Sequence, residues 1–174
     1  MSLLILTLPL ARPGPGTTYR YTLTADGDHA LRHESAAAAL LPAADRGGET
    51  VAVVPVQALS WHRVTLPPGL PLGTSATARV RSVLEGLLED SLLDEPAQLH
   101  FALAPEARAG AATWVAVCDR AWLREHLQAL EAAGRRPSRV VPEFAPGGPA
   151  QAWALGTPED AWLVRTGLAP DQGL

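Results

Sequence analysis

The side chains best suited to acid–base, nucleophilic or metal chemistry in this sequence are its five histidines and its single cysteine. They are His29, His33, His62, His100, His126 and Cys118. Zinc-binding motifs place two histidines one turn apart on a helix with a glutamate beside them, and none of these histidines lies in such a helical pair. Cys118 ends an apolar strand and lacks the signature of a cysteine protease. We therefore expect no catalytic and no metal-binding residues, and we interpret Cys118 as a core thiol.

Four carboxylate side chains lie close together in the sequence, at Glu89, Asp90, Asp94 and Glu95. Such a group could act as a carboxylate pair, bind a divalent cation, contact a protein partner, or simply be a solvated helix end. Of the specific roles we favour protein docking, because charges around a helix steer an encounter and select partners without chemistry. We predict a partner-binding face made of Arg79, Arg81, Glu85, Glu89 and Asp90.

Phosphate and amine chemistry are limited by the absence of lysine, since all 14 basic residues are arginine. A P-loop needs a lysine on the phosphates, and Schiff-base catalysis needs a lysine amine. The segment Gly14–Thr18 has the small residues of a phosphate loop, but prolines remove amides that such a loop would donate and no acid stands beside it. We interpret this segment as a surface loop and expect no cofactor.

Length and composition define the class of protein. With 174 residues and 47% hydrophobic residues, the chain can build a core without disulfides or structural metals. One cysteine and no paired cysteines indicate a reducing compartment. A net charge of -4 with scattered arginines argues against a nucleic-acid-binding protein. The first ten residues lack the basic region and the small-residue cleavage site of a signal peptide, so we expect none there. No apolar run reaches the ~18 residues that span a bilayer.

Alternating apolar residues predict strands in the first third of the chain. We expect strands at 3–8, 18–23, 49–55 and 61–66, a turn at 26–28, and a short helix at Ala36–Leu41 capped by Ser35. Gly/Pro segments separate these elements.

Helical periodicity begins near Thr77. The apolar residues Val80, Val83, Leu84, Leu87, Leu88 and Leu92 share one face of a predicted helix of about four turns. Paired strands at 99–103 and 113–118 follow, and then a helix capped by Asp119 and ended by Gly134 and Pro137. A short strand at 140–141 and a hairpin at 151–155 and 160–165 complete the chain. This order predicts an α/β fold, a mixed sheet with packed helices.

The segment Val83–Leu103 resembles the type II secretion system protein L family. Its Leu88-Glu89-Asp90 triplet and its Leu99-His100-Phe101-Ala102 strand match that family's pattern. Further matching stretches occur in the same order, at 61–67, 121–134, 139–143 and 161–167. The resemblance covers roughly residues 50–143 and extends to 167. One departure is Glu85, where the family usually has proline.

The resemblance implies an actin-like, RNase H-related fold. It also implies a non-catalytic scaffold on the cytoplasmic face of the bacterial inner membrane, which recruits the secretion ATPase (protein E) through that ATPase's N-terminal domain. Other implied partners are the platform proteins M, C and F and a second copy of the chain, with no nucleic acid or small-molecule substrate. Because the family continues into a single membrane helix and a periplasmic domain, we expect this chain to be part of a longer protein.

Two alternatives remain at this point: an actin-like nucleotide-binding ATPase, or an unrelated α/β domain with an accidental match. For the organisation of the chain we predict a β-rich subdomain at 1–70, an α/β subdomain at 71–150, and the start of a further hairpin or subdomain at 151–174.

Overall fold

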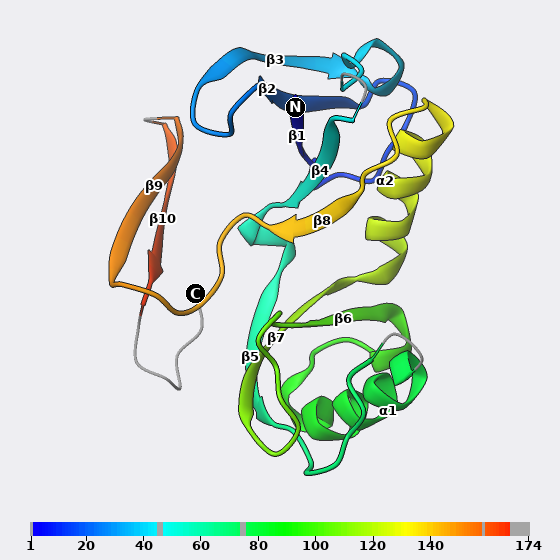
Figure 1. Cartoon of the computed structure of the whole chain (residues 1–174), viewed down its shortest axis with the longest axis vertical. Coiled ribbons are helices and arrows are strands. Elements are labelled where there is room, and N and C mark those ends of the chain that lie inside the picture. The colour runs from blue at the N-terminus through cyan, green and yellow to red at the C-terminus, as the bar shows by residue number, and fades with distance from the viewer. Residues whose placement is uncertain (1, 45–46, 74–75, 158, 168–174) are drawn as a thin grey trace. The chain divides into compact units, whose positions relative to one another are not determined.

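The computed structural model describes residues 2–44, 47–73, 76–157 and 159–167 (Figure 1). The chain divides into two units, each made of two segments. Unit 1 is Met1–Ala58 with Asp119–Glu143, and unit 2 is Leu59–Cys118 with Phe144–Leu174. The division into consecutive blocks at 1–70, 71–150 and 151–174 stays a prediction, whereas the spatial units interleave along the sequence.

Unit 1 contains a five-stranded mixed sheet. Its order is β3 (Ala30–Ala37), β2 (Thr18–Thr24), β1 (Leu3–Thr7), β4 (Glu49–Val54) and β8 (Arg139–Pro142). β1 is antiparallel to β2 and parallel to β4, and β4 is parallel to β8. Because side chains alternate along a strand, Leu4, Leu6 and Leu8 all point into the core and are almost fully buried.

The helix of unit 1, α2 (Arg120–Ala132), begins and ends as the sequence predicts. The Asp119 carboxylate accepts hydrogen bonds from the backbone N–H groups of Ala121 and Trp122, which are donors without an intrahelical partner. At the other end Gly134 adopts a φ of +70°, and the next N–H, of Arg135, donates to Leu130. This is the Schellman termination that glycine favours.

Unit 2 contains a three-stranded sheet with α1 (Thr77–Leu88) packed against it (Figure 1). The strand order is β5 (Ser60–Thr65), β7 (Ala112–Asp119) and β6 (Leu99–Leu103). Helix and sheet share an apolar core formed by Val64, Leu66, Leu70, Leu84, Leu88, Leu99, Val115 and Val117. Leu84 and Leu88 lie one turn apart, so their side chains enter the sheet together. Truncating either to alanine should cost about 2–5 kcal/mol of stability.

The predicted hairpin at the end of the chain is present as β9 (Gln151–Thr157) and β10 (Asp160–Thr166). It pairs in continuous antiparallel register from Asp160 opposite Thr157 to Thr166 opposite Gln151. Trp153 and Trp162 are about half exposed.

Three elements differ from the sequence predictions: β3 was not expected as a strand, and two predicted helices have a different form or length. Residues 36–41 were expected to be a short helix capped by Ser35, but Ser35 lies inside β3 opposite Arg20, and only the 3-10 helix Ala38–Leu40 follows. Hydrogen bonding to β2 overrides the helix propensity of alanine here. The helix expected from residue 77 is also shorter, since α1 ends at Leu88 and a 3-10 helix, Glu89–Ser91, continues it.

No helix in the part of the chain that the structure describes has both the length and the apolar character needed to cross a bilayer.

Candidate functional site

The predicted partner-binding residues all lie in unit 2, on α1 and the 3-10 helix that follows it. Arg79, Glu89 and Asp90 are exposed to solvent. The side chains of Arg81 and Glu85 are only 28% and 32% exposed. The structure therefore brings these residues onto two consecutive helical segments but gives their side chains different environments.

Arg81 is held by contacts within the chain. Its Nη1 donates to the carbonyl of Leu99 at 2.9 Å, and its Nη2 donates to that of Pro96 at 2.8 Å. Its Nε lies 2.8 Å from Oε1 of Glu85, and its guanidinium stacks over Phe101 at 5.3 Å from the ring centroid. These contacts join α1 to the start of β6, so Arg81 supports the local fold.

An acidic surface remains beside Arg81. We define the acidic face as the carboxylate-bearing residues on α1 and the segment after it: Glu85, Glu89, Asp90, Asp94 and Glu95. Four of them line a hollow of about 550 Å³ together with Leu92 and Leu93, and the Leu93 side chain is fully exposed. Among the described residues, Glu85 with Arg81 is the one ion pair that this face makes. An exposed apolar side chain that shares a hollow with carboxylates is suited to a protein contact.

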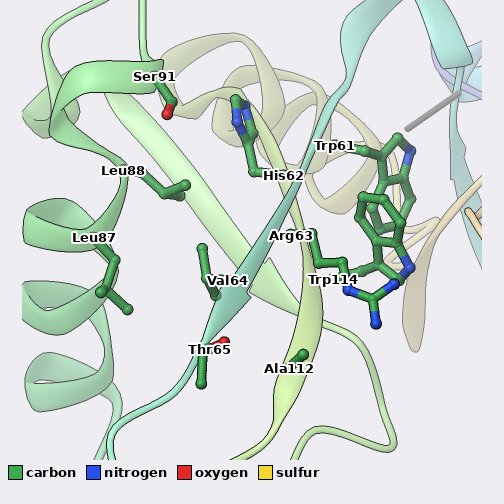
Figure 2. A pocket seen from close by; sticks show the side chains of 10 residues that line it. All are labelled: Trp61, His62, Arg63, Val64, Thr65, Leu87, Leu88, Ser91, Ala112 and Trp114. Carbon is green, nitrogen blue, oxygen red and sulfur yellow. The ribbon is translucent and has the colours of Figure 1, made fainter. Parts of the chain in front are cut away.

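A second hollow, of about 650 Å³, is lined by β5 residues Trp61–Thr65, whose side chains Figure 2 shows. Leu87, Leu88 and Ser91 border it on the side of α1, and Ala112 and Trp114 of β7 border it on the other side. The guanidinium of Arg63 lies over the Trp114 ring, 5.7 Å from its centroid. Burial lowers the pKa of His62, which favours its neutral form. Leu87, expected on the buried stripe of α1, is 44% exposed at this hollow.

The connection between β1 and β2 contains the candidate phosphate loop Gly14–Thr18, and the residues just before that loop contact α2. Trp122 Nε1 donates to the carbonyl of Pro9, and Arg12 forms ion pairs with Asp119 and Glu125. The Asp119 carboxylate occupies the N-terminus of α2, where a phosphate would otherwise bind. Hydrogen bonding from the N–H of Trp122 is the largest cause of the lowered pKa of Asp119, so the carboxylate stays charged.

His126 is the residue whose role the sequence analysis missed. Its ring is fully buried, Nδ1 lies 3.1 Å from the hydroxyl of Tyr19, and Nε2 lies 3.0 Å from the carbonyl of Ala11. The signal was its position one turn after Trp122 on the apolar stripe of α2. The other singled-out residues lie apart: Cys118 is buried, and the exposed His29 and His33 contact Asp26 and Thr22. Within the described residues, no group of three or more His, Cys, Asp or Glu could hold a metal ion.

Comparison with known proteins bears on the family and the fold of the chain. The family model for type II secretion system (T2SS) protein L matches residues 6–171. The type II secretion system protein L of Vibrio cholerae serotype O1 is 34% identical over 103 residues, which are 59% of this chain and 23% of that protein. The chain thus spans about a quarter of the length of that relative.

A solved structure is also similar. It is the cytoplasmic domain of EpsL, an inner-membrane component of the type II secretion system of Vibrio cholerae, with a TM-score of 0.69 and 21% sequence identity. The match covers all of this chain and 70% of that one, and it confirms the predicted mixed α/β fold of the actin-like class. Because the family model matches nearly the whole chain, the chain belongs to the type II secretion system protein L family.

Proposed function

We propose that this chain is a non-catalytic docking domain that binds the N-terminal domain of the secretion ATPase, protein E, and recruits it to the inner-membrane platform. Membership of the protein L family supports a role in type II secretion. The similar EpsL domain is described as cytoplasmic and as part of an inner-membrane component, which supports a place on the cytoplasmic face of that membrane. The platform proteins M, C and F would be reached through the full-length protein.

The observation that carries the proposal is the acidic face, whose hollow is also lined by the fully exposed Leu93. Exposed carboxylates around an apolar anchor give a partner both steering and a desolvated contact. Because Arg81 is bound to Leu99, Pro96 and Glu85, the outward charge of this face is negative. The partner surface should therefore be basic, with a pocket or groove that accepts a leucine.

The environments of the reactive side chains support a binding role over catalysis. Cys118 is a buried thiol, and both ring nitrogens of His126 are within hydrogen-bond distance of Tyr19 and Ala11. A general base must reach the proton that it abstracts, and these groups face the core.

Isothermal titration of the chain with the N-terminal domain of its cognate ATPase tests the proposal. We expect wild-type binding that weakens with salt, because the contact is charged. The double variant Glu89→Arg/Asp90→Arg and the single variant Leu93→Ser should each reduce affinity by about tenfold or more. The control Asp28→Arg/Glu106→Arg makes the same change in net charge at exposed positions away from the acidic face and should bind normally. Absence of binding by the wild-type chain would refute the proposal.

A further inference from the structure

β5 is an edge strand. The sheet order β5-β7-β6 places β7 on one side of it, and no described strand pairs with its other side. The N–H of Leu66 donates to Ala111 at the end of the β5–β7 ladder. Ladder bonds in an antiparallel pair come from every second residue, so the backbone N–H and C=O groups of Val64 and His62 also point toward β7. The backbone groups of Trp61 and Thr65 therefore point to the outer edge.

Figure 2 shows the side chains that line the hollow beside β5, with Leu87 and Leu88 of α1 on one side of the strand and Trp114 of β7 on the other. Successive side chains of a strand point to opposite faces, yet all residues from Trp61 to Thr65 line the same hollow. The side chain of Val64 points to the α1 face of the sheet and packs with Leu88, whereas the side chain of Arg63 lies on the opposite face with Trp114. A space that reaches both faces of one strand must run along its edge, and that shape fits an extended chain.

β5 lacks the register shift, the terminal proline and the short length that protect β3 and β8, the two edges of the five-stranded sheet. β3 carries Arg32, His33 and Glu34 and has a register shift where it meets β2, and β8 is four residues long and ends at Pro142. Proline, charge, irregularity and short length all discourage strand addition. β5 has six residues, no proline and an unbroken register with β7.

We propose that the outer edge of β5 binds an extended segment of a partner protein as an added strand. On the α1 side the segment would place apolar residues against Leu87 and Val64. On the other side it would place an acidic residue opposite Arg63, the charged residue of the lining. The same charge disfavours a second copy paired about Arg63, because this would set like charges opposite each other. This site goes beyond the ATPase-docking proposal and does not depend on it.

The test uses a phage-displayed library of random decapeptides selected on the immobilised protein. We expect enriched peptides that alternate apolar and polar residues and carry an acid. Binding of the synthetic peptide should weaken by about tenfold or more in Thr65→Pro, which removes an outward N–H without touching the β7 ladder, and should persist in Thr65→Val, which keeps it.

Two further measurements keep the outcome decisive even if Thr65→Pro fails to fold. N-methylation of successive peptide residues should weaken binding at alternate positions only, because every second N–H faces β5. Hydrogen exchange should show new protection of the Trp61 and Thr65 amides. No enriched peptide, N-methylation effects without alternation, or binding unchanged in folded Thr65→Pro would overturn the proposal. A dimer that Thr65→Pro abolishes in sedimentation analysis would also overturn it, by assigning the edge to a second copy.

Discussion

The hydroxyl of Tyr19 donates a hydrogen bond to Nδ1 of His126, 3.1 Å away inside unit 1. The direction follows from the other ring nitrogen, because Nε2 lies 3.0 Å from the carbonyl of Ala11, which can only accept. His126 is thus the neutral Nε2–H tautomer, and Tyr19 satisfies its remaining lone pair. Trp122 packs edge-on against the same ring, with the centroids 5.2 Å apart. The cluster ties β2 and the segment after β1 to α2.

Removing the Tyr19 hydroxyl should destabilise the protein. Tyr19→Phe leaves a buried nitrogen of His126 without a donor, which costs about 1–3 kcal/mol. Tyr21→Phe is the matched control, because the Tyr21 hydroxyl donates to Glu34, a residue that water can reach. Urea unfolding followed by circular dichroism gives both values. Equal losses in the two variants would contradict the role assigned to the Tyr19–His126 bond.

Burial is the main cause that lowers the pKa of His126 below its ordinary value of 6.5. Well above pH 6.5 the histidine is neutral in both states and contributes no pH dependence. As the pH falls below 6.5 the unfolded chain takes up a proton that the folded chain does not, so stability falls by at most roughly 1.4 kcal/mol per pH unit. The decline ends near the lowered folded pKa.

The pKa of His62 is also lowered by burial, so its contribution has the same sign. His126→Gln keeps a donor and an acceptor but cannot take up the proton, and it should flatten the decline between pH 6.5 and 5 in urea unfolding. His62→Gln should flatten it less, since His126 is fully buried and His62 is not. A slope unchanged in His126→Gln would show that other groups cause it.

The cap of α2 allows a separate prediction. Asp119→Ala should cost about 1 kcal/mol, because the N–H groups of Ala121 and Trp122 lose their acceptor. Asp119→Asn keeps an acceptor and should recover most of this loss, since the exposed ion pair with Arg12 contributes little. The lowered pKa of Asp119 adds stability that is present above the ordinary value of 3.8 and is lost as the pH falls through the folded pKa. Thermal unfolding of both variants at pH 7 is the measurement.

Local signals in the sequence were sufficient to predict α2. Asp119, the stripe beginning at Trp122, and Gly134 each act within a few residues, so the helix could be placed without knowledge of the rest of the fold. The confirmed strands likewise follow from alternation. The helix expected at 36–41 was wrong because the pairing of β3 with β2 decides that segment, and single-residue propensity is too weak to overcome it.

The interleaved units could not be predicted because they depend on non-local pairing. Val51 of β4 lies opposite Arg139 of β8, which returns the chain to unit 1 after a long excursion. Prediction of the candidate site from the sequence failed for a different reason, because side-chain contacts depend on the folded structure. The sequence shows the charge of Arg81 but not the carbonyls of Leu99 and Pro96 that hold it, and it shows His126 without its partner Tyr19.

Nucleotide binding was the alternative from the actin-like resemblance, and a thermal-shift assay with ATP and magnesium separates it from a docking role. A ligand at a hundredfold its Kd adds about 2.7 kcal/mol to stability. We expect no shift, because Asp119 already occupies the N-terminus of α2 and Arg12 is paired with it. A shift that depends on magnesium would favour the nucleotide-binding alternative.

The contacts of Arg81 predict that its substitution acts first on stability. Arg81→Lys cannot reach the carbonyls of Leu99 and Pro96 together or stack its planar group on Phe101, so it should lose about 1–3 kcal/mol. The exposed neighbour Arg79 is the control, and Arg79→Ala should change stability by no more than about 0.5 kcal/mol. Thermal unfolding measures both, and titration with the ATPase domain below the melting temperature then tests docking. If Arg81→Lys unfolds like the wild-type chain, these contacts do not support the fold, and its charge would be available to a partner.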